Sequence, residues 1–175
     1  MFLTTHAAAG ILISNYVHDP LAVFGLSFAS HFVLDFIPHG DRNIYGQYLQ
    51  EGPHRYRQAL MVSGLDVAAL MFLAAAVISQ PGLPNHELMI IGILGSILPD
   101  LLSHFFPIIH ERMSWLWVIR QLYRLTKPSG LRYFVRAQNW LHRVLHHSII
   151  HYDVSFTTGL SIQIGLTAVF LALSF

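Results

Sequence analysis

Long apolar stretches separated by shorter polar segments dominate the chain and predict helices. These stretches cover residues 2–17, 21–37, 59–78, 87–106 and 154–175. Apolar runs of this length are typical of membrane-spanning helices or of deeply buried ones. The first two are shorter than the ~20 residues usually needed to cross a bilayer, so we expect their polar ends to reach the membrane interface.

The polar segments predict surface structure. Residues 40–58 include Gly46, Gly52 and Pro53, which favour a loop lying on the membrane surface. Residues 107–128 mix tryptophan and tyrosine with arginine and lysine, which is typical of an interfacial amphipathic helix, and residues 131–151 predict a further amphipathic helix. We therefore expect an all-α integral membrane protein with about five transmembrane helices and one or two amphipathic interfacial helices, forming one domain over residues 1–175.

The composition agrees with a membrane protein and restricts the chemistry. Charged residues make up 11% of the chain, whereas soluble domains contain roughly 25%. The chain has no cysteine, which excludes disulfides and thiolate metal sites, but it has 12 histidines against 9 acidic residues. No basic cluster is interleaved with aromatic residues, so we expect no nucleic-acid partner.

The basic residues predict the orientation in the membrane. All 10 lysines and arginines lie within residues 42–57 and 112–143, on one side of a five-span topology. The positive-inside rule makes that side cytoplasmic, which predicts a multi-pass protein of the bacterial or archaeal cytoplasmic membrane with its amino terminus inside. This topology places most histidines and aspartates in the cytoplasmic half, with only His18 and His86 on the other face.

Histidine and aspartate recur at spacings that suit a metal site. His31, Asp35 and His39 are four residues apart, so on one helix they would share a face. Imidazole and carboxylate are ordinary ligands of zinc. The candidate ligands are His6, His31, Asp35, His39, Asp100, His104, His146, His147 and His151. A straight helix cannot direct His142, His146, His147 and His151 to one point, so which of these four are ligands stays open.

A weak internal repeat relates residues 21–79 to residues 88–175. Each copy contains an Asp-xxx-His, a His-Arg pair and a later Asp-Val, and two such half-sites would suit two metal ions. We expect His54 or His142 to act as general base and Arg55 or Arg143 to hold an anionic group, although either histidine could instead be a ligand. Asp41, Asp66 and Asp153 are expected to orient the ligands without binding the metal.

Four short motifs support this interpretation: Thr5-His6, Leu98-Pro99-Asp100 with His104, His142-Arg143-Val144-Leu145-His146-His147-Ser148, and Ser30-His31-Phe32-Val33-Leu34-Asp35. Together they resemble, at a distance, motifs of the bacterial inner-membrane-associated metal-dependent hydrolases, described as LexA-binding hydrolases. Two features depart from that pattern: the Ser-His-xxx-Asp motif comes before Leu-Pro-Asp rather than last, and His146 replaces a threonine. The resemblance implies a membrane-bound, zinc-dependent hydrolase.

The function expected from the sequence is a membrane-embedded, metal-dependent hydrolase with a His/Asp site at the cytoplasmic face. It would hold one or two zinc ions, with iron or manganese as alternatives, and act on a lipid, a lipid-linked substrate or another phosphoester. A histidine-rich di-iron oxidase or desaturase, or a metal transporter, are the competing interpretations. The sequence does not identify the substrate or the oligomeric state.

Overall fold

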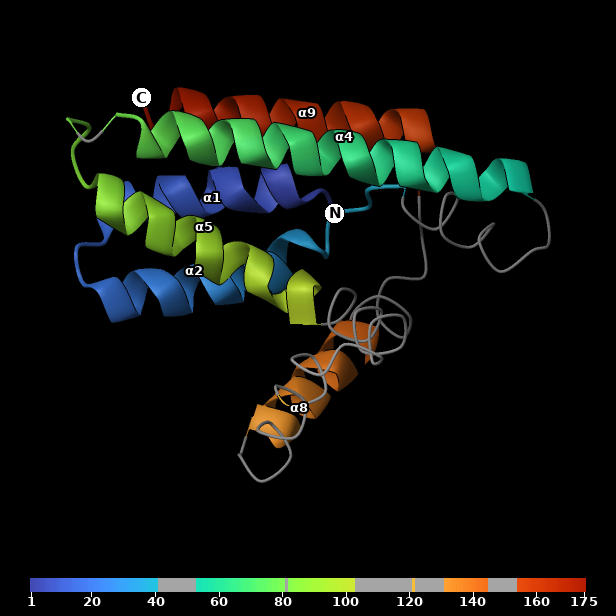
Figure 1. Ribbon diagram of the computed structural model, residues 1–175, viewed down its shortest axis with the longest axis horizontal. Helices are drawn as coiled ribbons and strands as arrows, with labels where there is room; N and C mark the ends of the chain where they lie inside the picture. Colours follow the sequence, from blue (N-terminus) through green and yellow to red (C-terminus); the bar gives the residue numbers. More distant parts are fainter. Residues whose placement is uncertain (41–52, 81, 103–120, 122–130, 145–153) are drawn as a thin grey trace.

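The protein is all-α over the residues described by the computed structural model, which are 1–40, 53–80, 82–102, 121, 131–144 and 154–175 (Figure 1). The helices are α1 (Leu3–Tyr16), α2 (Pro20–Leu34), α4 (Pro53–Ile78), α5 (His86–Asp100), α8 (Leu131–Val144) and α9 (Phe156–Ala172). The expectation of an all-α fold is therefore confirmed.

Five of these helices lie side by side as a bundle with α1 at its centre. Helix α1 packs against α2, α4, α5 and α9, and α5 also packs against α2 and α4. Helices α1, α4 and α9 run in one direction and α2 and α5 in the other (Figure 1). One end of the bundle consequently collects the first turns of α1 and α9 and the last turns of α2 and α5, and the start of α4 extends beyond this end (Figure 1).

The contact between α1 and α5 forms the core. Ala7 and Ile11 of α1 are fully buried and belong to one apolar cluster with Met89, Ile93 and Ile97 of α5. Burying apolar side chains in this way is the main favourable contribution to folding. Helix α1 has almost no exposed face, so its apolar residues contact other helices.

Glycines bring α5 very close to its neighbours. A Cβ atom on Gly10 of α1 would collide with the carbonyl group of Gly92 in α5, and a Cβ atom on Gly92 would collide with the carbonyl of Gly10. On another side of α5, a Cβ atom on Gly95 would lie 2.7 Å from the carbonyl oxygen of Phe24 in α2. Small residues at these positions therefore set the distance between the three helices.

Local sequence features determine how the chain turns before and after α2. Asp19 accepts a hydrogen bond from the backbone N–H of Ala22 at 2.7 Å, and Pro20 occupies the first turn of α2. Gly40 adopts a φ of +79°, and a Cβ atom there would lie 3.0 Å from the carbonyl oxygen of Ser155, just before α9. A left-handed glycine is thus needed where the chain after α2 passes the start of α9.

Two predicted helix ends need correction. Helix α2 ends at Leu34 rather than at residue 37, because Pro38 disfavours helical geometry in the residue before it, so His39 does not share a helix face with His31. Helix α4 begins at Pro53, so residues 53–58 are helical and not part of a surface loop. Proline suits the first turn of a helix, and no second proline follows it in α4.

The expectation of about five membrane-spanning helices is wrong. Among the described residues only α4 contains a segment long and apolar enough to cross a membrane, Met61–Ile78, with a mean hydropathy of 2.2. Helices α1, α2, α5 and α9 have 14, 15, 15 and 17 residues, below the ~20 that a bilayer requires. Apolar composition alone did not distinguish contact with lipid from contact between helices. Of the expected surface helices, α8 lies within residues 131–151, and residues 107–128 fall outside the described part except Gln121.

We expect Gly92→Ala to destabilise the protein by about 1–3 kcal/mol, because the added methyl group must push α5 away from α1. Gly64→Ala in α4 is the matched control, since a Cβ atom there meets nothing within 4 Å and alanine favours the helix by about 0.5–1 kcal/mol. Thermal unfolding of both variants measures the difference. A Gly92→Ala variant as stable as the Gly64→Ala variant would contradict the close packing described here.

Candidate metal centre

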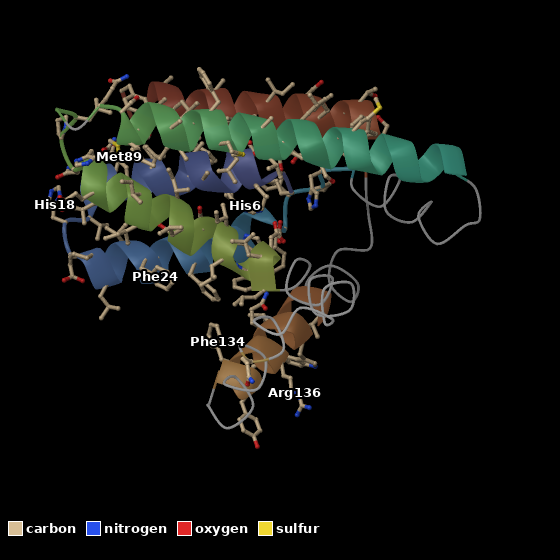
Figure 2. The ribbon with its side chains drawn as sticks, in the orientation of Figure 1. His6, His18, Phe24, Met89, Phe134 and Arg136 are labelled. Carbon is tan, nitrogen blue, oxygen red and sulfur yellow. The ribbon has the colours of Figure 1, made fainter. Side chains whose placement is uncertain are left out.

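Three buried ionisable side chains and one partly buried carboxylate meet at the end of the bundle where α1 begins and α2 and α5 end. His6 lies in the first turn of α1 and His31 in the last turn of α2, and both side chains are fully buried. Asp35 directly follows α2 and is 1% exposed, whereas Asp100 is the last residue of α5 and is 15% exposed. Figure 2 shows His6 inside the bundle, far from His18 at the opposite end.

His31 is held in a defined orientation by α5. Its Nδ1 lies 2.9 Å from the backbone carbonyl oxygen of Ser96, so this nitrogen carries a proton and donates it to the carbonyl. The other ring nitrogen, Nε2, lies 3.2 Å from Asp35 Oδ2 and 3.7 Å from Asp100 Oδ1. A histidine that donates one N–H to a backbone carbonyl and presents the other nitrogen to a polar site is the usual arrangement at protein metal sites.

His6 is stacked on His31 and lacks ordinary hydrogen bonds. The two ring centroids are 4.0 Å apart with an angle of 25° between the planes. Its Nε2 is 3.3 Å from Asp35 Oδ1, yet neither ring nitrogen makes a hydrogen bond of good geometry to any residue that the structure describes. A buried polar group without a hydrogen-bond partner destabilises the folded protein, which indicates that a further polar or ionic partner binds at this site.

The pKa values of these groups show how the charges interact. The pKa of His6 is lowered to about 4, chiefly by burial and then by the neighbouring charge of His31, although contact with Asp35 opposes both. Burial would also lower the pKa of His31, but contact with Asp35 and the charge of Asp100 outweigh it and raise this pKa. Burial would raise the pKa of Asp100, but the charges of His31, the amino terminus and His6 together outweigh it and lower this pKa. Two carboxylates therefore favour a cation between them.

Three of these residues have the geometry of a metal site. One donor atom each from His6, His31 and Asp100 lies within 4.8 Å of the others. Donor atoms around a tetrahedral zinc ion lie roughly 3.3 Å apart, so shifts of about 1 Å would bring this set onto one ion. Two imidazoles and a carboxylate are a ligand set that zinc accepts in hydrolytic enzymes.

Two groups just outside the helices border the cluster: the amino group of Met1, before α1, and the side chain of His39, after α2. The Met1 amino group lies 3.3 Å from Asp35 Oδ1 and 3.0 Å from His39 Nε2. His39 Nδ1 in turn lies 2.7 Å from the carbonyl oxygen of Ile37, which fixes the ring. His39 thus borders the cluster but is not among the three residues whose donor atoms converge.

Two polar side chains from other helices hold the first turn of α1, which carries His6. Asp66 of α4 accepts hydrogen bonds from the backbone N–H groups of Leu3 and Thr4 at 2.7 and 3.1 Å, and from the Thr4 hydroxyl. The buried Gln163 of α9 accepts from Phe2 N at 2.6 Å and donates to the carbonyl oxygen of His39 at 3.1 Å. These contacts satisfy backbone groups that the start of a helix leaves without partners.

The sequence-predicted site residues fall into three groups. The structure brings His6, His31, Asp35 and Asp100 together, with His39 beside them and Asp66 supporting α1. His54, Arg55, His142 and Arg143 lie in α4 and α8, at positions where only the backbone is described. The remaining predicted residues lie outside the described part of the chain: Asp41, His104, His146, His147, His151 and Asp153.

The sequence analysis missed Gln163 and the carbonyl group of Ser96. Gln163 had a signal, because it carries the only side-chain amide in a largely apolar helix. Strongly polar side chains in such helices usually have a binding partner or a function. A backbone carbonyl has no sequence signal. The repeat of residues 21–79 and 88–175 stays a prediction, although its equivalent residues Asp35 and Asp100 both face His31.

No protein-family model, curated protein or solved structure matches this chain.

We expect Asp66→Ala to lower stability by about 1–2 kcal/mol, as the loss of a helix cap does, and to weaken zinc binding because the turn that carries His6 loosens. Asp19→Ala is the matched control, because it removes a cap from α2 at the opposite end of the bundle. Chemical denaturation and zinc titration of both variants measure the two effects. Equal zinc affinity in the two variants would show that Asp66 stabilises the fold without positioning His6.

Proposed function

We propose that the protein is a metal-dependent hydrolase that binds zinc through His6, His31 and Asp100. The observation that carries the proposal is the convergence of three donor atoms within 4.8 Å at a buried site, with His31 oriented by the Ser96 carbonyl. Both imidazoles are fully buried, and the carboxylates favour a cation. The motifs that resemble the inner-membrane-associated metal-dependent hydrolases include all three residues, which adds support.

Asp35 has a different role in this proposal. Zinc sites that perform hydrolysis have three protein ligands and leave one position for water, whereas structural sites have four ligands. Asp35 lies 3.3 Å from His6 Nε2 and 3.2 Å from His31 Nε2, beside the position that a fourth ligand would occupy. A zinc ion there would act as a Lewis acid and lower the pKa of water to near 7. Asp35 would then accept the proton during attack on the substrate.

We place the protein at a membrane, with α4 as its anchor. The segment Met61–Ile78 has a mean hydropathy of 2.2 and only 11% of it is buried, unlike the core helix of a soluble protein. Leu65, Met71 and Phe72 are 71%, 66% and 79% exposed. Exposing such large apolar side chains to water is unfavourable, and lipid would remove that cost.

The membrane location suggests the class of substrate. The basic residues described by the structure occur in α4 before Met61 and in α8, both near the end of the bundle that holds the metal centre (Figure 1). By the positive-inside rule this end faces the cytoplasm. A phosphoester of a membrane lipid, or of a lipid-linked molecule, would reach the site from the bilayer surface, where arginine can bind its phosphate.

Metal analysis tests the ligand assignment. We expect purified protein to contain about one zinc ion per chain and His31→Ala and Asp100→Asn to lose it, since each removes one of three ligands. His18→Ala is the matched control, because His18 is exposed and lies at the opposite end of the bundle. Inductively coupled plasma mass spectrometry gives the metal content. Zinc lost equally in all three variants would indicate a folding defect, and protein that binds no zinc would refute the proposal.

Hydrolysis assays test the role of Asp35. We expect Asp35→Asn to retain zinc but to hydrolyse phosphodiesters roughly 10²–10⁴-fold more slowly, because the amide cannot accept the proton. The substrates are a chromogenic phosphodiester and a phospholipid in mixed micelles. Loss of zinc from this variant would make Asp35 a ligand, whereas unchanged turnover would exclude it as the base.

A further inference from the structure

Helix α8 exposes a continuous stripe of aromatic and aliphatic side chains. Tyr133, Phe134, Trp140 and Leu141 are 75%, 45%, 60% and 37% exposed, and Ala137 between them is also exposed. These positions are separated by three or four residues or are adjacent, so they form one face of the helix. Phe134, at one edge of this face, also contacts Phe28 of α2, whereas Tyr133 and Trp140 remain largely exposed.

A basic edge runs beside the apolar stripe. Helix α8 contains Arg132, Arg136 and Arg143 and no acidic residue. At 3.6 residues per turn these three arginines lie along one edge of the helix, next to Trp140. Arg136 is exposed, and Figure 2 shows it and Phe134 on the helix that projects from the bundle. Such a combination is typical of helices that lie in a membrane interface.

Helix α8 is connected to the metal centre along one edge of the stripe, where Phe134 and Gln138 are neighbours four residues apart. The buried Gln138 donates a hydrogen bond from Nε2 to the carbonyl oxygen of Pro99 at 3.1 Å, one residue before Asp100. The ring of Phe134 also contacts Phe28 of α2, with 5.7 Å between the centroids. The position of α8 is therefore linked to the ends of both helices that supply His31 and Asp100.

We propose that α8 docks on the surface of an anionic phospholipid bilayer and holds the metal centre beside the lipid head groups. The apolar stripe would lie at the boundary of the acyl chains, and the arginines would contact lipid phosphates. Tryptophan and tyrosine are enriched at that depth. A continuous apolar stripe fits lipid better than single-stranded RNA, which binds grooves where separate aromatic rings stack on bases. The proposal rests on the membrane location proposed above but not on the metal chemistry.

Single-cysteine labelling of the full-length chain tests the docking, since the chain has no natural cysteine. Ala137→Cys places an environment-sensitive nitrobenzoxadiazole dye in the apolar stripe, and Asn139→Cys, on the opposite side of α8 by helix register, is the matched control. Both proteins are reconstituted in vesicles of phosphatidylcholine and phosphatidylglycerol. We expect lipids with a nitroxide on the acyl chain to quench the dye at position 137 strongly and the dye at position 139 weakly.

A further variant measures how much the charge of Arg136 contributes to the docking of α8. Adding Arg136→Gln to the Ala137→Cys protein should reduce the ratio of docked to undocked α8 by about fivefold, because each arginine near an anionic surface contributes roughly that factor. Vesicles of phosphatidylcholine alone should show weak docking for both proteins. Docking that is equally strong in neutral vesicles would overturn the assignment of an anionic surface.

Flotation of the vesicles separates this proposal from the anchoring by α4. A chain that floats with the vesicles while the dye at position 137 stays in water overturns the docking of α8 but leaves the anchor intact. A chain that does not float refutes both the anchor and the docking of α8. A dye that responds to a single-stranded RNA oligonucleotide and not to lipid would also overturn the proposal.

Discussion

The close contact between the backbones of α1 and α5 is the constraint on which the rest of the structure depends. Gly10 and Gly92 allow the two helices to approach until a single added carbon atom would collide with a carbonyl group. Gly95 allows a similarly close approach of α2 on another side of α5. Because α1 supplies His6, α2 supplies His31 and α5 supplies Asp100, these contacts also fix the distances between the polar groups at the end of the bundle.

The polar cluster is tolerated in this core because its members compensate one another. A buried carboxylate without a partner would cost several kcal/mol. Here Asp35 contacts two imidazoles and an amino group, and Asp100 faces His31. The backbone carbonyl of Ser96 and the side chains of Asp66 and Gln163 bind the surrounding donors. Unsatisfied hydrogen-bonding capacity remains on His6, whose buried ring lacks good hydrogen bonds to the described residues.

The sequence predicted the helical class and the main members of the cluster, because both depend on local patterns. Apolar runs indicated each helix of the bundle, and spacings of four residues drew attention to His31 and Asp35. It could not predict that α2 ends at Leu34, which removes His39 from the helix face. Nor could it distinguish apolar residues that face other helices, such as Ile11, from those that face outward, such as Phe72. That difference is a property of packing, and it caused the error in the number of membrane spans.

The donor atoms of the cluster come from positions 6, 31 and 100, which are distant in the sequence and meet only when three helices have docked. An unfolded chain cannot present them together, so a cation that binds this set binds the native state almost exclusively. Its binding free energy is then added to the stability of the fold, by about 2.7 kcal/mol when the free ion is at one hundred times its dissociation constant. The abundance of folded protein would in this way depend on the supply of the ion.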